Sequence, residues 1–238
     1  MYSRDDNRYA VALRSRVYQR AVIKTFALLL FAAAIVFGAA FLMQSCRAHE
    51  LVSLPASNTG GAVQSEYSST PVEQWQQGVM PTLYQKDPQW SNYPYAASAF
   101  SESGCGPACL AMVYIYLTGD RSQTPATIAA MATSSGCASP EGTAWLFMTA
   151  GAHALGISAQ ELPADRGLVA MHLSADNPII VVLGPGDFTS EGHFIVLTGI
   201  DANNQVTVRD PNSVERTNQT WDLDSLMIQI RNLWVYHQ

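Results

Sequence analysis

The sequence predicts an α+β fold in which N-terminal helices pack on an antiparallel sheet, preceded by one transmembrane helix. Three observations support this prediction. Residues 25–43 contain no charged side chain, helix-type segments fill 105–173, and apolar runs separated by turn residues fill most of 178–236. Helices followed by strands are typical of an α+β domain. A chain of 238 residues has room for one domain of ordinary size together with extra segments.

The first 24 residues are predicted to form a cytoplasmic basic tail, because they hold six basic and two acidic side chains. As a helix, the apolar run 25–43 would span about 28 Å, close to the thickness of a bilayer's hydrocarbon core. It is longer than the apolar part of a cleaved signal peptide. Basic residues precede it and few follow, which predicts a single-pass anchor in the cell membrane with an extracellular C-terminal domain. Lipid attachment at Cys46 is the alternative, although Met43 and Gln44 fit such a site poorly.

Residues 44–80 are predicted to form a flexible extracellular stalk, since they are rich in Ser, Thr, Gly and Gln and lack a sustained apolar period. A short helix over 72–79 is compatible with this stalk. The folded domain is predicted to span 81–238. The chain has a net charge of −6 although its first 24 residues are basic, so the remainder is more acidic still. This balance argues against nucleic acid as a partner.

Five helices are predicted in the folded domain from their start and stop signals. Pro107 suits the first turn of a helix and Gly119 suits its end, which predicts a helix from about Cys105 to Leu117. Prolines or capping residues also precede or open the other segments. These helices are expected at 125–132, 139–155, 166–173 and 222–230.

Four strands are predicted after the first four helices. The run Ile-Ile-Val-Val-Leu at 179–183 is typical of a buried strand. Asp-Ala-Asn-Asn at 201–204 predicts a turn that joins strands 193–200 and 205–210 as a hairpin. A last strand is expected at 233–236. One layer of helices is predicted to pack on this sheet.

Cys105 is the candidate nucleophile. It lies between two glycines at the predicted start of a helix, where the partial positive charge and free N–H groups favour a thiolate. The small neighbours would leave the sulfur open to a substrate. The alternative interpretation is that Cys105 is a small buried core residue, as most cysteines beside apolar helices are.

His193 and Asp210 are the candidate partners of Cys105. The predicted hairpin brings the start of one strand beside the end of the next, and neighbouring strands lie about 5 Å apart. A thiol, a histidine and a carboxylate in this arrangement can act as nucleophile, proton carrier and orienting group. Taken alone, His193 is more typical of a core histidine and Asp210 of an ordinary turn residue.

In its motifs the sequence resembles the C39-like cysteine peptidases, which have a papain-like fold. The resemblance covers about 81–238 and rests on four motifs in order: Gln-Lys-Asp at 85–87, Gly-Cys-Gly-Pro-Ala at 104–108, Gly-His-Phe-Ile-Val at 192–196 and Asp-Pro at 210–211. It implies catalytic roles for Cys105, His193 and Asp210, and an oxyanion role for Gln85. In bacteriocin-processing members this glutamine stands only a few residues before the cysteine. Here about 20 residues intervene, so that segment must fold back.

The resulting hypothesis is a membrane-anchored extracellular cysteine peptidase that hydrolyses peptide or amide bonds through a thioester acyl-enzyme. The expected partners are a peptide or peptidoglycan-type substrate and the membrane through residues 25–43. No cofactor and no metal are expected, since no Cys or His pair has zinc-site spacing. The alternative is a catalytically silent module that binds peptide or cell wall. Cys109 is expected to be buried, and a disulfide between Cys109 and Cys137 remains open.

Overall fold

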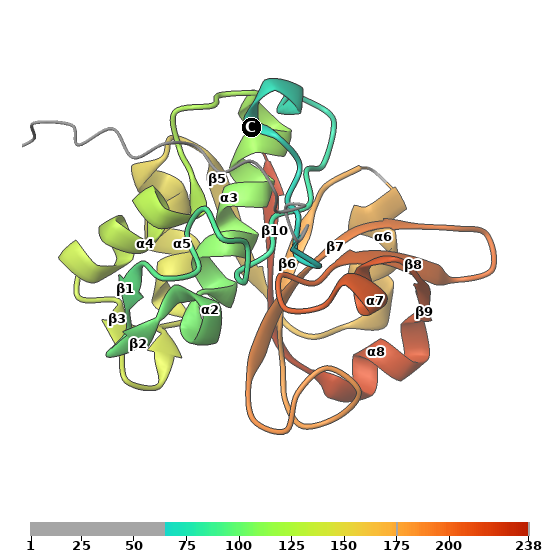
Figure 1. The fold of residues 1–238 in the computed structure, drawn as a ribbon. Helices are drawn as coiled ribbons and strands as arrows, with labels where there is room; N and C mark the ends of the chain where they lie inside the picture. The colour runs from blue at the N-terminus through green and yellow to red at the C-terminus, as the bar shows by residue number, and fades with distance from the viewer. Residues whose placement is uncertain (1–64, 175, 238) are drawn as a thin grey trace, which may run out of the picture. The chain divides into compact units, whose positions relative to one another are not determined.

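The computed structural model describes residues 65–174 and 176–237 (Figure 1). These residues belong to the second of two units, which begins at Ala62. The predicted basic tail, the apolar run 25–43 and Cys46 lie outside the described residues.

The cell-membrane location with an extracellular domain is a prediction that the structure corrects. Among the described residues, no helix is both long enough and apolar enough to cross a bilayer. The 14-residue helix α3 (Cys105–Thr118) illustrates the physical reason. At about 1.5 Å per residue it is roughly 21 Å long, short of the roughly 30 Å that a span requires. Its apolar side chains are instead buried in the protein's own core.

A six-stranded sheet forms the centre of the fold (Figure 1). Its strand order is β5-β10-β6-β7-β8-β9, and every neighbouring pair is antiparallel. The predicted antiparallel sheet is therefore present, with two strands that the sequence did not reveal. The strands are β5 (Ser158–Leu162), β6 (Ile179–Leu183), β7 (His193–Ile200), β8 (Gln205–Arg209), β9 (Thr220–Asp222) and β10 (Ile230–His237).

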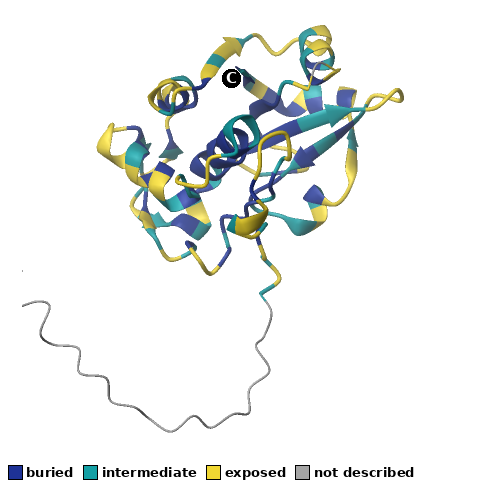
Figure 2. Cartoon of the chain, turned by 90° about the horizontal axis from the view of Figure 1, so that it is seen from above, coloured by how far each residue is buried: buried dark blue, intermediate teal, exposed yellow. Residues whose placement is uncertain are grey.

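Helices cover both faces of this sheet, whereas the sequence predicted one helix layer. One side holds α3, α4 (Pro125–Ser134) and α5 (Leu146–Ala154), and the other holds α6 (Arg166–Ser174) and α8 (Leu223–Gln229) (Figure 1). Strand β6 shows the physical reason. Its alternate side chains enter two separate apolar clusters, so the strand is buried on both sides. Figure 2 shows the buried residues concentrated along the central strands and the helix beside them.

The predicted helix start at residue 139 is wrong. A small hairpin occupies this segment, with strands β3 (Ala138–Ser139) and β4 (Gly142–Thr143). Gly142 has a φ of +107°, outside the helical region, and α5 begins only at Leu146. Other short elements that the sequence did not predict are β1 (Pro94–Tyr95), β2 (Ser98–Ala99), α2 (Phe100–Ser103) and α7 (Val214–Thr217).

The folded part of the chain begins before the predicted boundary at residue 81. A single turn of 3₁₀-helix, η1 (Val72–Gln74), takes the place of the short helix expected over 72–79. Trp75 is buried in the core, and its Nε1 donates to the carbonyl oxygen of Thr70 at 2.8 Å. The Nε of Arg121 donates to the Trp75 carbonyl oxygen at 3.0 Å. These contacts attach the end of the predicted stalk to the domain.

Candidate active site

Cys105 is the first residue of α3 and is half-buried. The short helix α2 leads into it through Gly104. Burial by itself would raise the pKa of the Cys105 thiol, but the hydrogen bond and charge of His193 lower it. Backbone hydrogen bonds with Phe194 and Gly106 add to this effect, and overall the pKa lies below its ordinary value of 9.0. The site therefore favours a thiolate at Cys105.

The glycines on either side of Cys105 have a packing role that the sequence did not reveal. A Cβ at Gly104 would lie 2.5 Å from the carbonyl oxygen of Phe100. A Cβ at Gly106 would lie 2.7 Å from the Oγ1 of Thr143 in β4. Both positions therefore exclude a side chain because neighbouring atoms already fill the space. The Gly-Cys-Gly motif allows the start of α3 to approach α2 and β4 closely.

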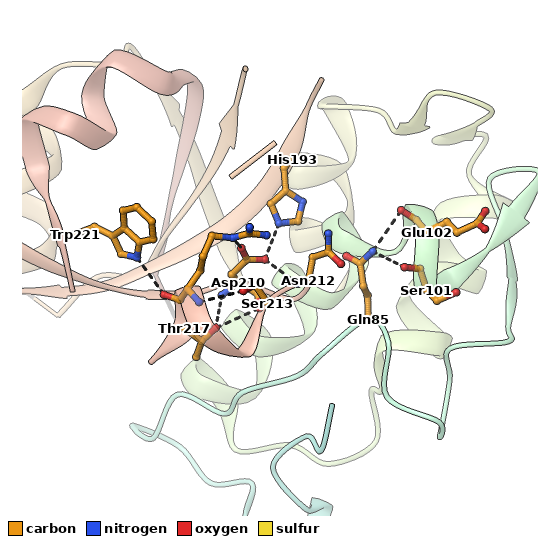
Figure 3. A network of polar contacts seen from close by, with 10 residues as sticks. Gln85, Ser101, Glu102, His193, Asp210, Asn212, Ser213, Thr217 and Trp221 are labelled. Atoms are coloured by element: carbon orange, nitrogen blue, oxygen red, sulfur yellow. Dashed lines mark hydrogen bonds and ion pairs between the residues drawn. The ribbon is translucent and has the colours of Figure 1, made fainter. Parts of the chain in front are cut away.

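His193 and Asp210 meet in the structure, as the sequence predicts. The His193 Nε2 and the Asp210 Oδ1 are 2.7 Å apart, and both residues are buried (Figure 3). Val196, rather than His193, pairs with Arg209 across the two strands. The histidine and the carboxylate are therefore diagonal neighbours, and the imidazole reaches along the sheet to Asp210.

The charges of this pair depend on each other. Burial would lower the pKa of His193, but the hydrogen bonds with Asp210 and Cys105, together with their charges, raise it to about 9. Burial would raise the pKa of Asp210, but His193, Arg216 and the Asn212 N–H lower it overall. A protonated imidazole between two anions is thus the favoured state near neutral pH.

Asp210 has two further partners that the sequence did not predict. The Nε of Arg216 donates to its Oδ2 at 2.5 Å. The backbone N–H of Asn212 donates to its Oδ1 at 2.7 Å (Figure 3). Each carboxylate oxygen is therefore bonded. The Asn212 contact is a local turn interaction that the sequence Asp-Pro-Asn could have indicated. The sequence did not indicate the contact between Arg216 and Asp210, because this contact depends on how α7 is placed.

Gln85 lies near the start of α3 despite the intervening 20 or so residues. It is buried, and its backbone N–H donates to the carbonyl oxygen of Pro211 at 2.7 Å. Its side-chain Nε2 donates to the carbonyl oxygens of Ser101 at 2.7 Å and Glu102 at 3.3 Å (Figure 3). The segment thus folds back, and Gln85 joins the helix before Cys105 to the loop after Asp210. Its Oε1 is buried without a hydrogen-bond partner among the described residues.

Asp87, the acid of the Gln-Lys-Asp motif, binds backbone N–H groups and stabilises a turn. It is buried, and its two carboxylate oxygens accept from the backbone N–H groups of Ser69 at 2.8 Å and Gln89 at 2.9 Å. The Nε1 of Trp90 donates to the carbonyl oxygen of Tyr84 at 2.7 Å across the same turn. This turn holds the backbone on both sides of Gln85.

The remaining cysteines of the described segments are not paired. Cys109 and Cys137 are free and buried, so the disulfide left open by the sequence is not formed here. Burial raises the pKa of Cys109 well above 9.0, which makes this thiol unreactive at neutral pH. Within 65–174 and 176–237, no group of three His, Cys, Asp or Glu side chains could hold a metal ion.

A thiol at a helix start beside a buried histidine–carboxylate pair is the arrangement used by thiol-dependent acyl-transfer enzymes. Residues 80–238 match the Peptidase_C39 like family. The chain belongs to this family, which confirms the family predicted from the motifs. No curated protein matches the chain in a comparison of sequences.

Two solved structures match the chain in a comparison of structures. The first is the peptidase domain of Streptococcus ComA, described as a bi-functional ABC transporter involved in a quorum sensing pathway. Its identity is 21% over 58% of this chain and 93% of that chain, with a TM-score of 0.42. The second is a double glycine motif protease from an AMS/PCAT transporter, in complex with the leader peptide. Its identity is 17% over 68% of this chain and 94% of that chain, with a TM-score of 0.45.

Proposed function

We propose that this protein is a cysteine peptidase that hydrolyses a peptide bond through a thioester on Cys105. One observation carries the proposal: His193 and Asp210 form a buried pair with 2.7 Å between Nε2 and Oδ1, and the imidazole lowers the pKa of the Cys105 thiol at the start of α3. Membership of the Peptidase_C39 like family supports the same reaction class and a peptide as the substrate.

Asp210 determines which nitrogen of His193 handles the proton. Because Asp210 binds Nε2, the other ring nitrogen, Nδ1, is left for the thiol and later for the leaving group. With a pKa of about 9, His193 is protonated at neutral pH and pairs with a Cys105 thiolate. Nucleophile and general acid are therefore both in their reactive forms before the substrate arrives.

Acylation follows from these protonation states. The Cys105 sulfur forms a bond to the substrate carbonyl carbon, and the electron pair of the carbonyl double bond moves to oxygen. When the intermediate collapses, the carbon–nitrogen bond breaks and His193 gives its proton to the departing amine. A thioester on Cys105 and a neutral imidazole remain. Deacylation reverses the roles: His193 takes a proton from the attacking water, and the thiolate is the leaving group.

Gln85 is proposed as a donor to the oxyanion. Its Nε2 carries two hydrogens, and the bond to the Ser101 carbonyl oxygen at 2.7 Å uses one of them. The contact with the Glu102 carbonyl oxygen is longer, at 3.3 Å, so the second hydrogen is available to a stronger acceptor. A negatively charged oxygen is such an acceptor.

The test is the pH profile of iodoacetamide alkylation at Cys105, followed by mass spectrometry of the peptide that contains it. In the wild type we expect a midpoint well below the free-thiol value of about 8.5, and in His193→Ala a midpoint close to that value. Hydrolysis of a peptide mixture by the wild type but not by Cys105→Ala would complete the assignment. A wild-type midpoint near 8.5, together with no hydrolysis, would refute the proposal in favour of a binding module.

A further inference from the structure

The buried carboxylate of Asp210 is shared between two cations. His193 binds one oxygen at 2.7 Å and Arg216 binds the other at 2.5 Å. The Asp210 side chain is 0% exposed, whereas that of Arg216 is 23% exposed. We propose that Arg216 is a positioning residue: it orients Asp210 towards His193 and keeps it ionised, and thereby favours the Cys105 thiolate. This inference rests on the proposed function and extends it.

Arg216 is itself held from three sides. Its backbone N–H donates to the Oγ of Ser213, the N-cap of α7, at 3.1 Å. Its carbonyl oxygen accepts from the Nε1 of Trp221 at 3.1 Å. Its guanidinium lies 5.6 Å from the centre of the Phe188 ring, which packs on Trp221 at 4.3 Å between ring centres. A side chain held in this way presents its Nε in one orientation.

Thr217, the residue after Arg216, holds the backbone of Asp210. Its Oγ1 accepts from the Asp210 N–H at 2.9 Å and donates to the Asp210 carbonyl oxygen at 3.2 Å. Consecutive residues of α7 therefore bind the carboxylate and the main chain of Asp210. Phe188, beneath the guanidinium, belongs to the connection that leads from β6 into His193. Arg216 thus contacts both segments that carry the histidine–carboxylate pair.

The other ionisable groups that face Asp210 do not replace Arg216. Burial raises the pKa values of Tyr84 and Cys109, and the negative charge of Asp210 raises both further, so both groups stay neutral beside it. The guanidinium of Arg209 interacts with Tyr84, and its Nη1 donates to the carbonyl oxygen of Val208 at 3.1 Å. Among the described residues, His193 and Arg216 are the side chains that form ion pairs with Asp210.

The sign of the effect follows from these charges. Loss of the Arg216 cation leaves Asp210 buried with one cationic partner, so its pKa rises. A protonated Asp210 no longer stabilises the imidazolium, and without the imidazolium the thiolate is less favoured. Loss of a nearby positive charge also disfavours the thiolate directly. Both changes move thiolate formation at Cys105 to higher pH.

The experiment measures the acid-side midpoint of iodoacetamide alkylation at Cys105 in the full chain. Arg216→Gln should raise this midpoint by about one pH unit, which makes alkylation about tenfold slower below it. Arg216→Lys keeps a positive charge and should lie between the wild type and Arg216→Gln. Arg166→Gln is the matched control, because Arg166 binds Asp224 through Nε at the same 2.5 Å but at the surface, and it should leave the midpoint unchanged.

A merely structural role for Arg216 would lower the folded fraction, measured by circular dichroism, without moving the midpoint of the folded protein. An unmoved midpoint in folded Arg216→Gln would overturn the proposal, as would equal midpoints in the Lys and Gln variants. If Arg216→Gln does not fold, Arg216→Met carries the same test, because its apolar stem can lie on Phe188. A wild-type midpoint near 8.5, together with no hydrolysis, would instead overturn the proposed function. A low wild-type midpoint that no Arg216 variant moves would overturn this inference alone.

Discussion

Asp210→Asn removes the charge of the carboxylate and almost nothing of its volume. The amide oxygen can still accept a hydrogen bond from His193 Nε2, but it no longer attracts the imidazolium. Arg216, left without its anion, then repels the imidazolium. We expect the pKa of His193 to fall from about 9 and the acid-side midpoint of Cys105 alkylation to rise.

The size of this effect follows from the pKa of His193. The pKa of His193, about 9 against the ordinary 6.5, reflects a preference for the protonated form of a few kcal/mol. Asp210 and Cys105 both supply it, and the hydrogen bond to Asp210 is the largest favourable contribution. Loss of the Asp210 charge should therefore move the midpoint by about one pH unit. Alkylation below the midpoint should then slow roughly tenfold.

The assay records alkylation rates between pH 4 and pH 10 for the folded wild type and for Asp210→Asn. Asp224→Asn is the matched control, because it removes a carboxylate that an arginine Nε binds at 2.5 Å on the surface. The control should keep the wild-type midpoint. If Asp210→Asn also keeps the wild-type midpoint, Asp210 does not set the charge state of the Cys105–His193 pair and the reasoning fails.

Three further predictions concern packing, the oxyanion and acid stability. Gly106→Ala places a Cβ 2.7 Å from the Thr143 Oγ1 and should cost about 1–3 kcal/mol in urea unfolding, whereas Gly199→Ala, with no atom within 4 Å, should cost less. Gln85→Ala should slow peptide hydrolysis about 10²–10³-fold but leave iodoacetamide alkylation unchanged, because that displacement forms no oxyanion; equal losses in both assays would argue against the oxyanion role. Because the fold lowers the pKa of Asp210, its ion pairs contribute stability above the ordinary value of 3.8, and this stability is lost as pH falls. Asp210→Asn should therefore lose less unfolding free energy than the wild type between pH 5 and pH 3, and parallel curves would contradict this.

The sequence predicted helices and strands correctly where residues within the same segment specify them. Thr124 followed by Pro125 predicted the start of α4, and Asp165 and Asp222 predicted the starts of α6 and α8. The apolar run at 179–183 predicted β6, and the turn before Gln205 predicted the hairpin of β7 and β8. These features depend on residues a few positions apart, so periodicity and capping chemistry reveal them.

The pairing of strands that are distant in the sequence could not be predicted from such local signals. Strand β10, the last of the chain, lies between β5 and β6, and β5 was not predicted at all. The sequence of β5, Ser-Ala-Gln-Glu-Leu, has no strong apolar pattern. This segment becomes a strand because the edge of β10 provides backbone hydrogen bonds. The hairpin at 138–143 was mistaken for a helix start because proline and glutamate suit both.

The sequence by itself determined the family and the candidate residues Cys105, His193, Asp210 and Gln85, because each stands in a short motif of its own. Only the tertiary structure decided how these residues are supported. Packing explains the glycines beside Cys105, and the fold of the segment before α2 brings Gln85 to its neighbours. The ion pair between Asp210 and Arg216 depends on the placement of the four-residue helix α7. Contacts of this kind join residues through space, so they follow from the packing of the whole domain and leave no periodic trace in the chain.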